Sequence, residues 1–507
     1  MCLVASEATK LNAATETKNF KVNEDKAFTC RMGFGVFAND MRQEPLPLEP
    51  WPTSILDDET VAGVISVLDV QSQNGYNMID IAGLFPMAMG DNGWPVDFTK
   101  VADQARITRI NQIVDAAHQR GIRVICLQTG VLASGFQNII RHDPGVKGTS
   151  EFCMCPAKEK SWVWMDKIYD YVIDNFNFDG FHLESADRGR CLCEECKKNW
   201  PLNSQYHSYV TSRAAQYVRG RAPKSYLATI IFGWTTPKVG FTSEDIDQIV
   251  KLGDSVDIIF DQGHQGLLVP RQEDIDSGLR TGYPRELFVK RLQCNYGTSG
   301  GVWNYPPHRW DRTSWFLPYT KRTAEALKEQ YDVGARGCLF YQGPVANPGT
   351  EMNIAFSGRI LADPGKDYDQ VLAEVIEDIY KPENAEAEKK LAEIFQRAEE
   401  IYFSHWRAER VRKSWGIIDS QHEFYMDSLF GTSPGPAGYL EDLYLGGPDG
   451  RLEYKTGLVS ILKDLEPIEN SFDDNGRIEK IKRSIIITLT LINTFAQGRS
   501  ETKVYRD

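Results

Sequence analysis

Residues 99–131, TKVADQARITRINQIVDAAHQRGIRVICLQTGV, contain the repeating unit that decides the fold. An amphipathic helical pattern ends at Arg120, Gly121 follows it, and an apolar run begins at Arg123. Glycine is favoured directly after a helix because it adopts the left-handed conformation that ends many helices. The apolar run has the length and composition of a buried strand. This stretch therefore predicts a helix that leads through a tight turn into a parallel strand.

The same unit occurs along the chain, and Gly75 and Gly334 precede two further strand-like runs in the same way. We predict strands over residues 30–38, 76–85, 123–131, 178–185, 226–234, 256–262, 286–297 and 335–343. We predict helices between them over residues 58–73, 99–120, 160–176, 205–220, 243–252 and 318–331. Eight βα units predict an α/β fold of the (β/α)8 TIM barrel type. A doubly wound open sheet is the alternative, but no nucleotide-binding glycine motif follows any predicted strand.

The chain has 507 residues, which exceeds the roughly 250 to 300 residues that a single core supports. We expect an N-terminal arm over 1–27, a barrel over 28–348 and a helical C-terminal domain over 349–507. Helical patterns in this last region cover residues 352–361, 368–380, 385–405, 454–468 and 477–495.

Composition excludes several classes of protein. Hydrophobic residues make up 42% of the chain and charged residues 25%, which is typical of a globular enzyme. The net charge of −13 and the lack of a long Lys/Arg cluster argue against nucleic acid or an anionic membrane as partner. No apolar stretch reaches the roughly 18 to 20 residues of a membrane span. We expect a soluble protein, either cytoplasmic or exported with its signal removed, and leave its oligomeric state open.

Strand ends hold the candidate catalytic residues, because the carboxyl ends of barrel strands form the active-site face. In the fourth strand, period 2 groups Glu184 with His182, and the sixth strand carries Asp261 near its end. Glycosidic hydrolysis needs two carboxyl groups, one to protonate the leaving oxygen and one to activate water or attack carbon. We predict Glu184 as general acid and Asp261 as base, and a wide separation between them would favour inversion. Asp187 and Asp80 are alternatives for the second role.

A sugar site also needs aromatic and polar side chains around these acids. The predicted substrate-binding residues are His182, Trp234, Gln262, His264, Gln293, Asn295, Trp303, Tyr341, Gln342 and Asp80. The plainer interpretations are that each aromatic residue is internal packing and that each single acid is a solvated charge or a helix cap.

Five cysteines lie in two segments, CMCP and CLCEEC, that follow the third and fourth predicted strands. They are Cys153, Cys155, Cys191, Cys193 and Cys196. Thiolates at C-x-C and C-x-x-C spacing predict a structural zinc site that four of the five would complete. Disulfides in an exported protein and free thiols are the alternatives. We expect no cofactor for catalysis.

The segment FDGFHLESADRGRCLCEEC, residues 178–196, together with CMCPAKEKSW before it, resembles a group of barrel glycosidases. In that group a Cys-Pro segment precedes the fourth strand, and a C-x-C-x-x-C run follows its acid. The group includes endo-β-N-acetylglucosaminidases, with α-glucuronidases and β-hexosaminidases as more distant relatives. The resemblance extends weakly over residues 352–380, which look like the helix that follows the barrel there. It implies that Glu184 is the proton donor and that the substrate is a carbohydrate.

The chain departs from these relatives at three places. Leu183 stands where hexosaminidases that use the substrate acetamido group carry Asp, and the predicted seventh strand ends at Gln293 to Asn295 where retaining barrels carry Glu. The usual N-terminal domain of the group also has no counterpart before Cys30. We therefore predict a glycoside hydrolase with inversion as the working hypothesis. The alternatives are a non-catalytic carbohydrate-binding barrel and a barrel lyase or isomerase that uses His182 and His264.

Overall fold

The computed structural model describes residues 20, 22–35, 56–85, 93–186, 189–231, 234, 241–261, 283–301, 316–403 and 447–504. Eight parallel strands follow one another around a closed barrel, and the last strand pairs with the first. The strands are β1 (Cys30–Gly35), β2 (Met78–Ala82), β3 (Arg123–Leu127), β4 (Gly180–His182), β5 (Tyr226–Ile230), β6 (Ile258–Asp261), β7 (Asn295–Gly301) and β8 (Gly337–Tyr341). The predicted (β/α)8 TIM barrel is confirmed.

The seventh strand differs from its prediction. Arg285–Arg291 forms helix α9, and β7 begins only at Asn295, near the end of the run predicted as a strand. The apolar residues of RELFVKR suit a helix as well as a strand, whereas NYGTSGG is too rich in glycine to look like a strand. A Cβ on Gly297 would lie 2.6 Å from the Phe260 ring, so β7 lacks a side chain where Phe260 needs the space.

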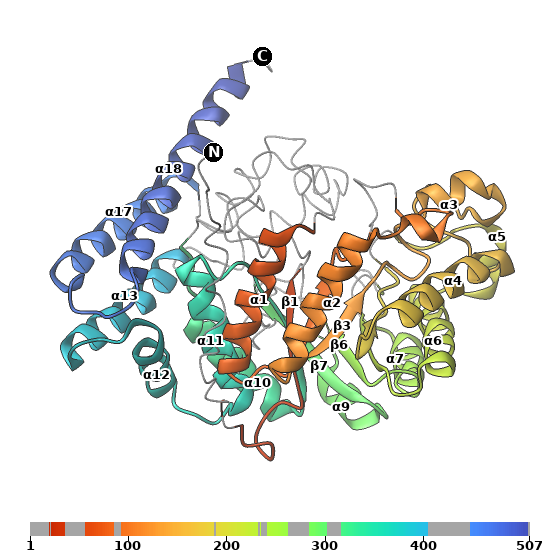
Figure 1. The fold of residues 1–507 in the computed structure, drawn as a ribbon, viewed down its shortest axis with the longest axis horizontal. Helices are drawn as coiled ribbons and strands as arrows, with labels where there is room; N and C mark the ends of the chain where they lie inside the picture. The colour runs from red at the N-terminus through yellow and green to blue at the C-terminus, as the bar shows by residue number, and fades with distance from the viewer. Residues whose placement is uncertain are drawn as a thin grey trace, which may run out of the picture.

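Helices surround the barrel, as Figure 1 shows. They are α1 (Asp58–Gln73), α2 (Gln104–Gln119), α3 (Gln137–His142), α4 (Glu159–Asn175), α5 (Glu194–Asn199), α6 (Asn203–Arg221), α7 (Ser243–Leu252), α9, α10 (Thr320–Val333) and α11 (Pro348–Ala362). The Asp57 side chain caps α1 by accepting from the Thr60 N–H. The turn glycines Gly75, Gly121 and Gly334 have φ values of 94°, 70° and 110°, which confirms their predicted left-handed conformation.

Two apolar layers fix the direction of each strand residue. The barrel interior is lined by alternate strand residues, which include Met32, Met78, Ile125, Ala228, Ile258, Phe260 and Leu339. The outer core lies between the strands and the helices and takes the intervening residues, such as Ile79, Phe181, Ile259 and Phe340. Membership of a layer therefore shows whether a residue faces into the barrel or out toward the helices.

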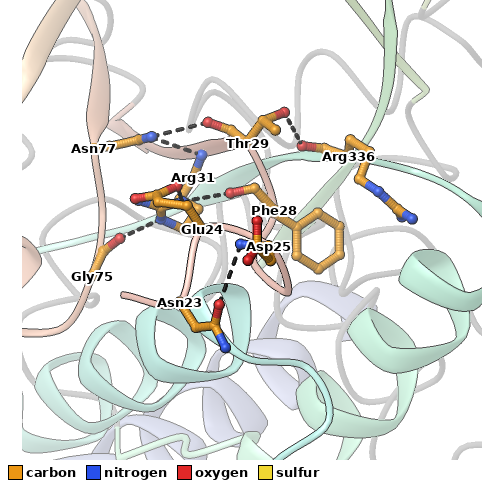
Figure 2. A network of polar contacts seen from close by, with 9 residues as sticks. All are labelled: Asn23, Glu24, Asp25, Phe28, Thr29, Arg31, Gly75, Asn77 and Arg336. Atoms are coloured by element: carbon orange, nitrogen blue, oxygen red, sulfur yellow. Dashed lines mark hydrogen bonds and ion pairs between the residues drawn. The ribbon is translucent and has the colours of Figure 1, made fainter. Parts of the chain in front are cut away.

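The amino end of β1 is held by the polar network of Figure 2. Buried Arg31 donates from Nε to the Gly75 carbonyl oxygen and from Nη1 to the Phe28 carbonyl oxygen, each at 2.6 Å. The Asn77 amide nitrogen donates to the Thr29 carbonyl oxygen at 2.9 Å. These bonds join the segments before β1 and β2 at the end of the barrel opposite the expected active-site face.

Helix α11, which follows β8, packs against α1 and α10, and nearly all of its residues are buried. The Ser357 hydroxyl lies 2.7 Å from the Tyr76 hydroxyl, and Arg359 Nε donates to Asn74 Oδ1 at 2.8 Å. The predicted boundary between 348 and 349 falls after the first residue of this helix.

The remaining helices, drawn in cyan and blue in Figure 1, lie to one side of the barrel. They are α12 (Tyr368–Tyr380), α13 (Ala385–Phe403), α17 (Gly447–Leu465) and α18 (Arg477–Val504). Buried Glu399 of α13 joins them to the barrel by accepting from the backbone N–H groups of Lys321 and Arg322 at the start of α10. Burial raises the pKa of Glu399 to about 7. Among the described helices, none combines the length and apolar character needed to cross a bilayer.

Candidate active site at the carboxyl end of β4

The end of β4 directs two polar residues into the barrel. Phe181 and Leu183 belong to the outer core, so His182 and Glu184 lie on the opposite, inward face. The backbone past the strand is held in place, because the Leu183 N–H donates to the Ala228 carbonyl oxygen at 2.8 Å and the Glu184 carbonyl oxygen accepts from the Val131 N–H at 2.6 Å. Glu184 is half-buried, whereas His182, one layer deeper, is buried.

A buried ion pair lies beneath Glu184. The Nδ1 atom of His182 is 2.5 Å from Oδ2 of Asp80, which projects inward from β2. Burial lowers the pKa of His182, but the negative charges of Asp80 and Glu184 outweigh that effect, and the pKa is raised overall. Side chains of β2 and β4, the two neighbours of β3, thus contact each other inside the barrel. Side chains from alternate strands form the layers of a barrel interior in this way. The protonation of His182 is coupled electrostatically to Glu184.

Aromatic rings and unused polar atoms surround this pair. The Phe34 ring lies edge-on to His182 with centroids 6.1 Å apart, and the Tyr341 ring is 4.9 Å from Phe34. Within the described part of the chain, His182 Nε2 and Asp80 Oδ1 have no hydrogen-bond partner. Buried polar atoms without partners are uncommon and cost free energy, so they mark sites of functional interest. Tyr341 faces inward at the end of β8.

Asp261 does not face the barrel interior, which corrects its predicted position beside Glu184. Its neighbour Phe260 fills the interior, so Asp261 points outward between β6, β7 and α9. Its Oδ2 accepts from Arg285 Nε at 2.9 Å and from the Tyr296 hydroxyl at 2.7 Å, and its Oδ1 accepts from the Thr298 hydroxyl at 2.9 Å. Asp261 has no exposed surface, so its contacts are those of a structural charge in the barrel wall.

The other described residues that were predicted to bind substrate lie at the wrong end of a strand or face away from the barrel interior. Gln293 and Asn295 lie before and at the start of β7, so their predicted position at the end of the seventh strand is wrong. Gln342 leaves the barrel and accepts from Gln71 of α1 at 2.7 Å, so it does not line the mouth. Trp234 is fully buried and stacks on the His207 ring at 5.6 Å, which fits the packing interpretation. Asp187, Gln262, His264 and Trp303 lie outside the described residues.

Several residues that surround these acids were not among the predicted site residues. Arg285, Tyr296 and Thr298 were hidden because the register of the seventh strand was misplaced. Ser299 of β7 pairs in register with the inward-facing Leu339, so it also faces the interior. Phe34 stood within a correctly predicted strand, and its alternation with Met32 was a signal that could have found it.

Four of the five predicted cysteines form one cluster. The Sγ atoms of Cys155, Cys191, Cys193 and Cys196 all lie within 4.8 Å of one another. A hydrogen bond between the two sulfur atoms raises the pKa of Cys155 and lowers the pKa of Cys191. Such a cluster favours a thiolate, the form in which cysteine binds metals. Cys153 is buried beside the cluster, and its sulfur accepts from the Ser150 hydroxyl at 3.3 Å.

Comparison with known proteins gives relatives in fold alone. No family model matches the sequence, and no curated protein matches it. Among solved structures, a GH138 enzyme targeting pectin rhamnogalacturonan II is 12% identical with a TM-score of 0.53. The match covers 90% of this chain and 56% of that one, so this chain spans little more than half of the enzyme's length.

Two further similar structures are a hydrolase and a glucuronidase. An O-GlcNAc hydrolase mutant of Thermobaculum terrenum is 10% identical with a TM-score of 0.48, over 93% of this chain and 85% of that one. A GH115 4-O-methyl-α-glucuronidase is 12% identical with a TM-score of 0.45, over 92% of this chain and 58% of that one. At these identities, the similarity to the GH138 enzyme supports the barrel fold.

Proposed function

We propose that this protein is a glycoside hydrolase in which Glu184 is the general acid. The observation that carries the proposal is the position of Glu184 at the inward face of the carboxyl end of β4, above the buried Asp80–His182 pair. Catalytic groups of barrel enzymes occupy this end of the strands. The barrel glycosidases similar in fold are consistent with this reaction class.

In the proposed reaction, protonated Glu184 gives its proton to the leaving glycosidic oxygen while a second carboxylate activates water or attacks the anomeric carbon. His182 is held by Asp80 and interacts electrostatically with Glu184. Asp187, three residues after Glu184, is our proposal for the second carboxylate because Asp261 faces outward. Inversion loses the argument from the spacing of Glu184 and Asp261, and it now rests on Leu183 and on the lack of an acid in β7.

The test is a screen for the release of new reducing ends over a panel of oligosaccharides and glycans. Glu184→Gln keeps the shape of the side chain and removes its acid, so we expect turnover to fall by roughly 10²- to 10⁴-fold. Glu159→Gln is the matched control, because Glu159 is an exposed acid at the start of α4. Equal turnover by Glu184→Gln and the control would reject Glu184 as the acid.

One observation favours a second reaction class. A histidine held by a buried carboxylate, with no hydrogen-bond partner for Nε2 in the described structure, is a common general base. In a barrel lyase this nitrogen would remove a proton from carbon. Elimination leaves a carbon–carbon double bond in the product, whereas hydrolysis adds water across the broken bond. Mass spectrometry of the product separates the two, since the hydrolysed product is heavier by one water.

A further inference from the structure

The loops that follow β3 and β4 bring four cysteines into one buried cluster. Cys155 lies just before α4, while Cys191 and Cys193 follow β4 and Cys196 lies in α5. Three of the four are buried and Cys193 is half-buried. The Cys155 sulfur is 3.5 Å from that of Cys196 and 3.8 Å from that of Cys193.

These distances match a metal centre. Zinc binds thiolate sulfur at about 2.3 Å, so the six edges of a regular tetrahedral four-sulfur site are each about 3.8 Å long. A disulfide instead requires two sulfur atoms about 2.05 Å apart. Cys155 lies at a tetrahedral-edge distance from two different partners, and one sulfur cannot form disulfides with both.

We propose that Cys155, Cys191, Cys193 and Cys196 bind one structural zinc ion that fastens the β3 loop to the β4 loop beside the candidate active site. The proposal goes beyond the glycosidase reaction, because the ion stabilises the fold and takes no part in bond cleavage. Four thiolates complete a tetrahedral shell and leave no open position for water or substrate, as in structural zinc sites.

The backbone around the cluster holds the ligands in place. The Met154 N–H donates to the Leu132 carbonyl oxygen at 2.9 Å, and the Cys191 N–H donates to the Tyr206 hydroxyl at 3.1 Å. A Cβ on Gly148 would lie 2.6 Å from the Cys153 sulfur and 3.3 Å from the Cys191 sulfur, so this loop must pass the cluster without a side chain. Outer contacts of this kind orient the ligands of metal sites.

The surrounding charge also suits an anionic centre. One zinc ion with four thiolates has a net charge of two negative units. Arg190, adjacent to Cys191, lies over the Tyr206 ring at 5.3 Å. Two of its buried nitrogens, Nε and Nη1, have no hydrogen-bond acceptor in the described structure. A guanidinium in this position offsets part of the negative charge of the proposed site.

The experiment measures metal in the full-length protein. The protein is purified under reducing conditions without chelator, and we expect elemental analysis to find one zinc per chain. Replacing Cys193 and Cys196 by serine should remove most of this zinc and lower the melting temperature. Cys153→Ser is the matched control, because Cys153 is a buried cysteine of the same loop outside the four-sulfur cluster. It should keep the zinc.

Should the double variant fail to fold, the wild-type protein alone decides the question. Stripped with a chelator and titrated with zinc sulfate, it should take up one ion and lose four reactive thiols. Protein that takes up no zinc, that contains iron in its place, or that has a disulfide among these four cysteines would overturn the proposal. None of these measurements uses a substrate, so failure of the glycan screen and failure of the zinc proposal are distinguishable.

Discussion

The carboxyl ends of β4 and β6 each carry an acid, and the two acids have opposite surroundings. Glu184 lies two residues after the inward-facing His182, so it faces the same way. Asp261 comes directly after Phe260, whose side chain fills the barrel interior, so Asp261 faces outward. Asp261 is then fixed by Arg285 and two hydroxyl groups. Side chains alternate between the two faces of a strand. This alternation therefore decides whether an acid at a strand end can reach a substrate or lies between the barrel and its helices.

Asp261→Asn should have the largest effect on stability among the changes at the two strand ends. The change leaves the guanidinium of Arg285 buried without its carboxylate. Removing one partner of a buried ion pair costs about 3 to 5 kcal/mol, so we expect the free energy of unfolding to fall by that amount. Denaturant unfolding measures it.

The profile should be the reverse of that proposed for Glu184→Gln: lower stability with unchanged turnover per folded molecule. In the double variant Asp261→Asn/Arg285→Met, no unpaired charge is left, so part of the lost stability should return. A folded Asp261→Asn protein without turnover would restore Asp261 as a candidate base.

Asp80→Asn tests the Asp80–His182 pair inside the barrel. Hydrogen bonds to charged groups contribute about 1.5 to 3 kcal/mol, and we expect a loss of stability in that range. The pKa of His182 is raised in the folded protein, so folded His182 keeps its proton at pH values where the unfolded chain has lost it. The stability that His182 gains from its raised pKa is therefore fully present below pH 6.5 and is lost as the pH rises through the raised pKa.

Unfolding free energies at several pH values above 6.5 measure this decline in the wild type and in Asp80→Asn. We expect a smaller pH dependence in the variant, since its His182 no longer has the carboxylate that holds the proton. Identical slopes in the two proteins would mean that Asp80 does not raise the pKa of His182.

The smallest expected effect on stability comes from His207, which contacts Ser185 on the outward face just past β4. His207 contacts the Ser185 hydroxyl at 3.1 Å, and burial, together with the charge of Arg190, lowers its pKa to about 3. The unfolded chain therefore binds a proton between about pH 6.5 and pH 3 that folded His207 does not, and stability falls as the pH falls. Between pH 6 and pH 5 this one group should cost about 1 kcal/mol.

His207→Gln keeps a polar side chain and removes the titration. We expect its unfolding free energy to decrease less than that of the wild type between pH 6 and pH 5. Both histidines are buried, but only His182 has a carboxylate beside it. Their contributions to the free energy of unfolding would then change with pH in opposite directions. Equal acid sensitivity of variant and wild type would contradict the lowered pKa.

Helices and strands could be predicted where the apolar periodicity and the capping residues indicated the same element. Helices 58–73, 243–252 and 368–380 end where the sequence predicted, because caps and apolar periods coincide there. The glycine-rich β7 has no such pattern, so its position was lost. The face of Asp261 could not be predicted either, since every residue of β6 is buried and its sequence does not show which side faces the barrel interior.

The candidate site could be predicted in part for a similar reason. His182 and Glu184 follow from period 2 in β4, because the outward partners Phe181 and Leu183 are clearly apolar. The contact between His182 and Asp80 spans 102 residues of sequence, and only the closed barrel brings the two together. The spacing of the cysteines predicted that they lie together, but nothing in the sequence showed that Cys153 lies outside the four-sulfur cluster.

The pairing of β1 with β8 also affects how the chain folds. Cys30 lies in register with Gly337, and the Phe28 N–H donates to the carbonyl oxygen of Leu361. During synthesis the first strand therefore leaves the ribosome with one edge unpaired, and it must wait for more than half of the chain before that edge is covered. Contacts so distant in sequence slow folding, and an open strand edge invites intermolecular pairing.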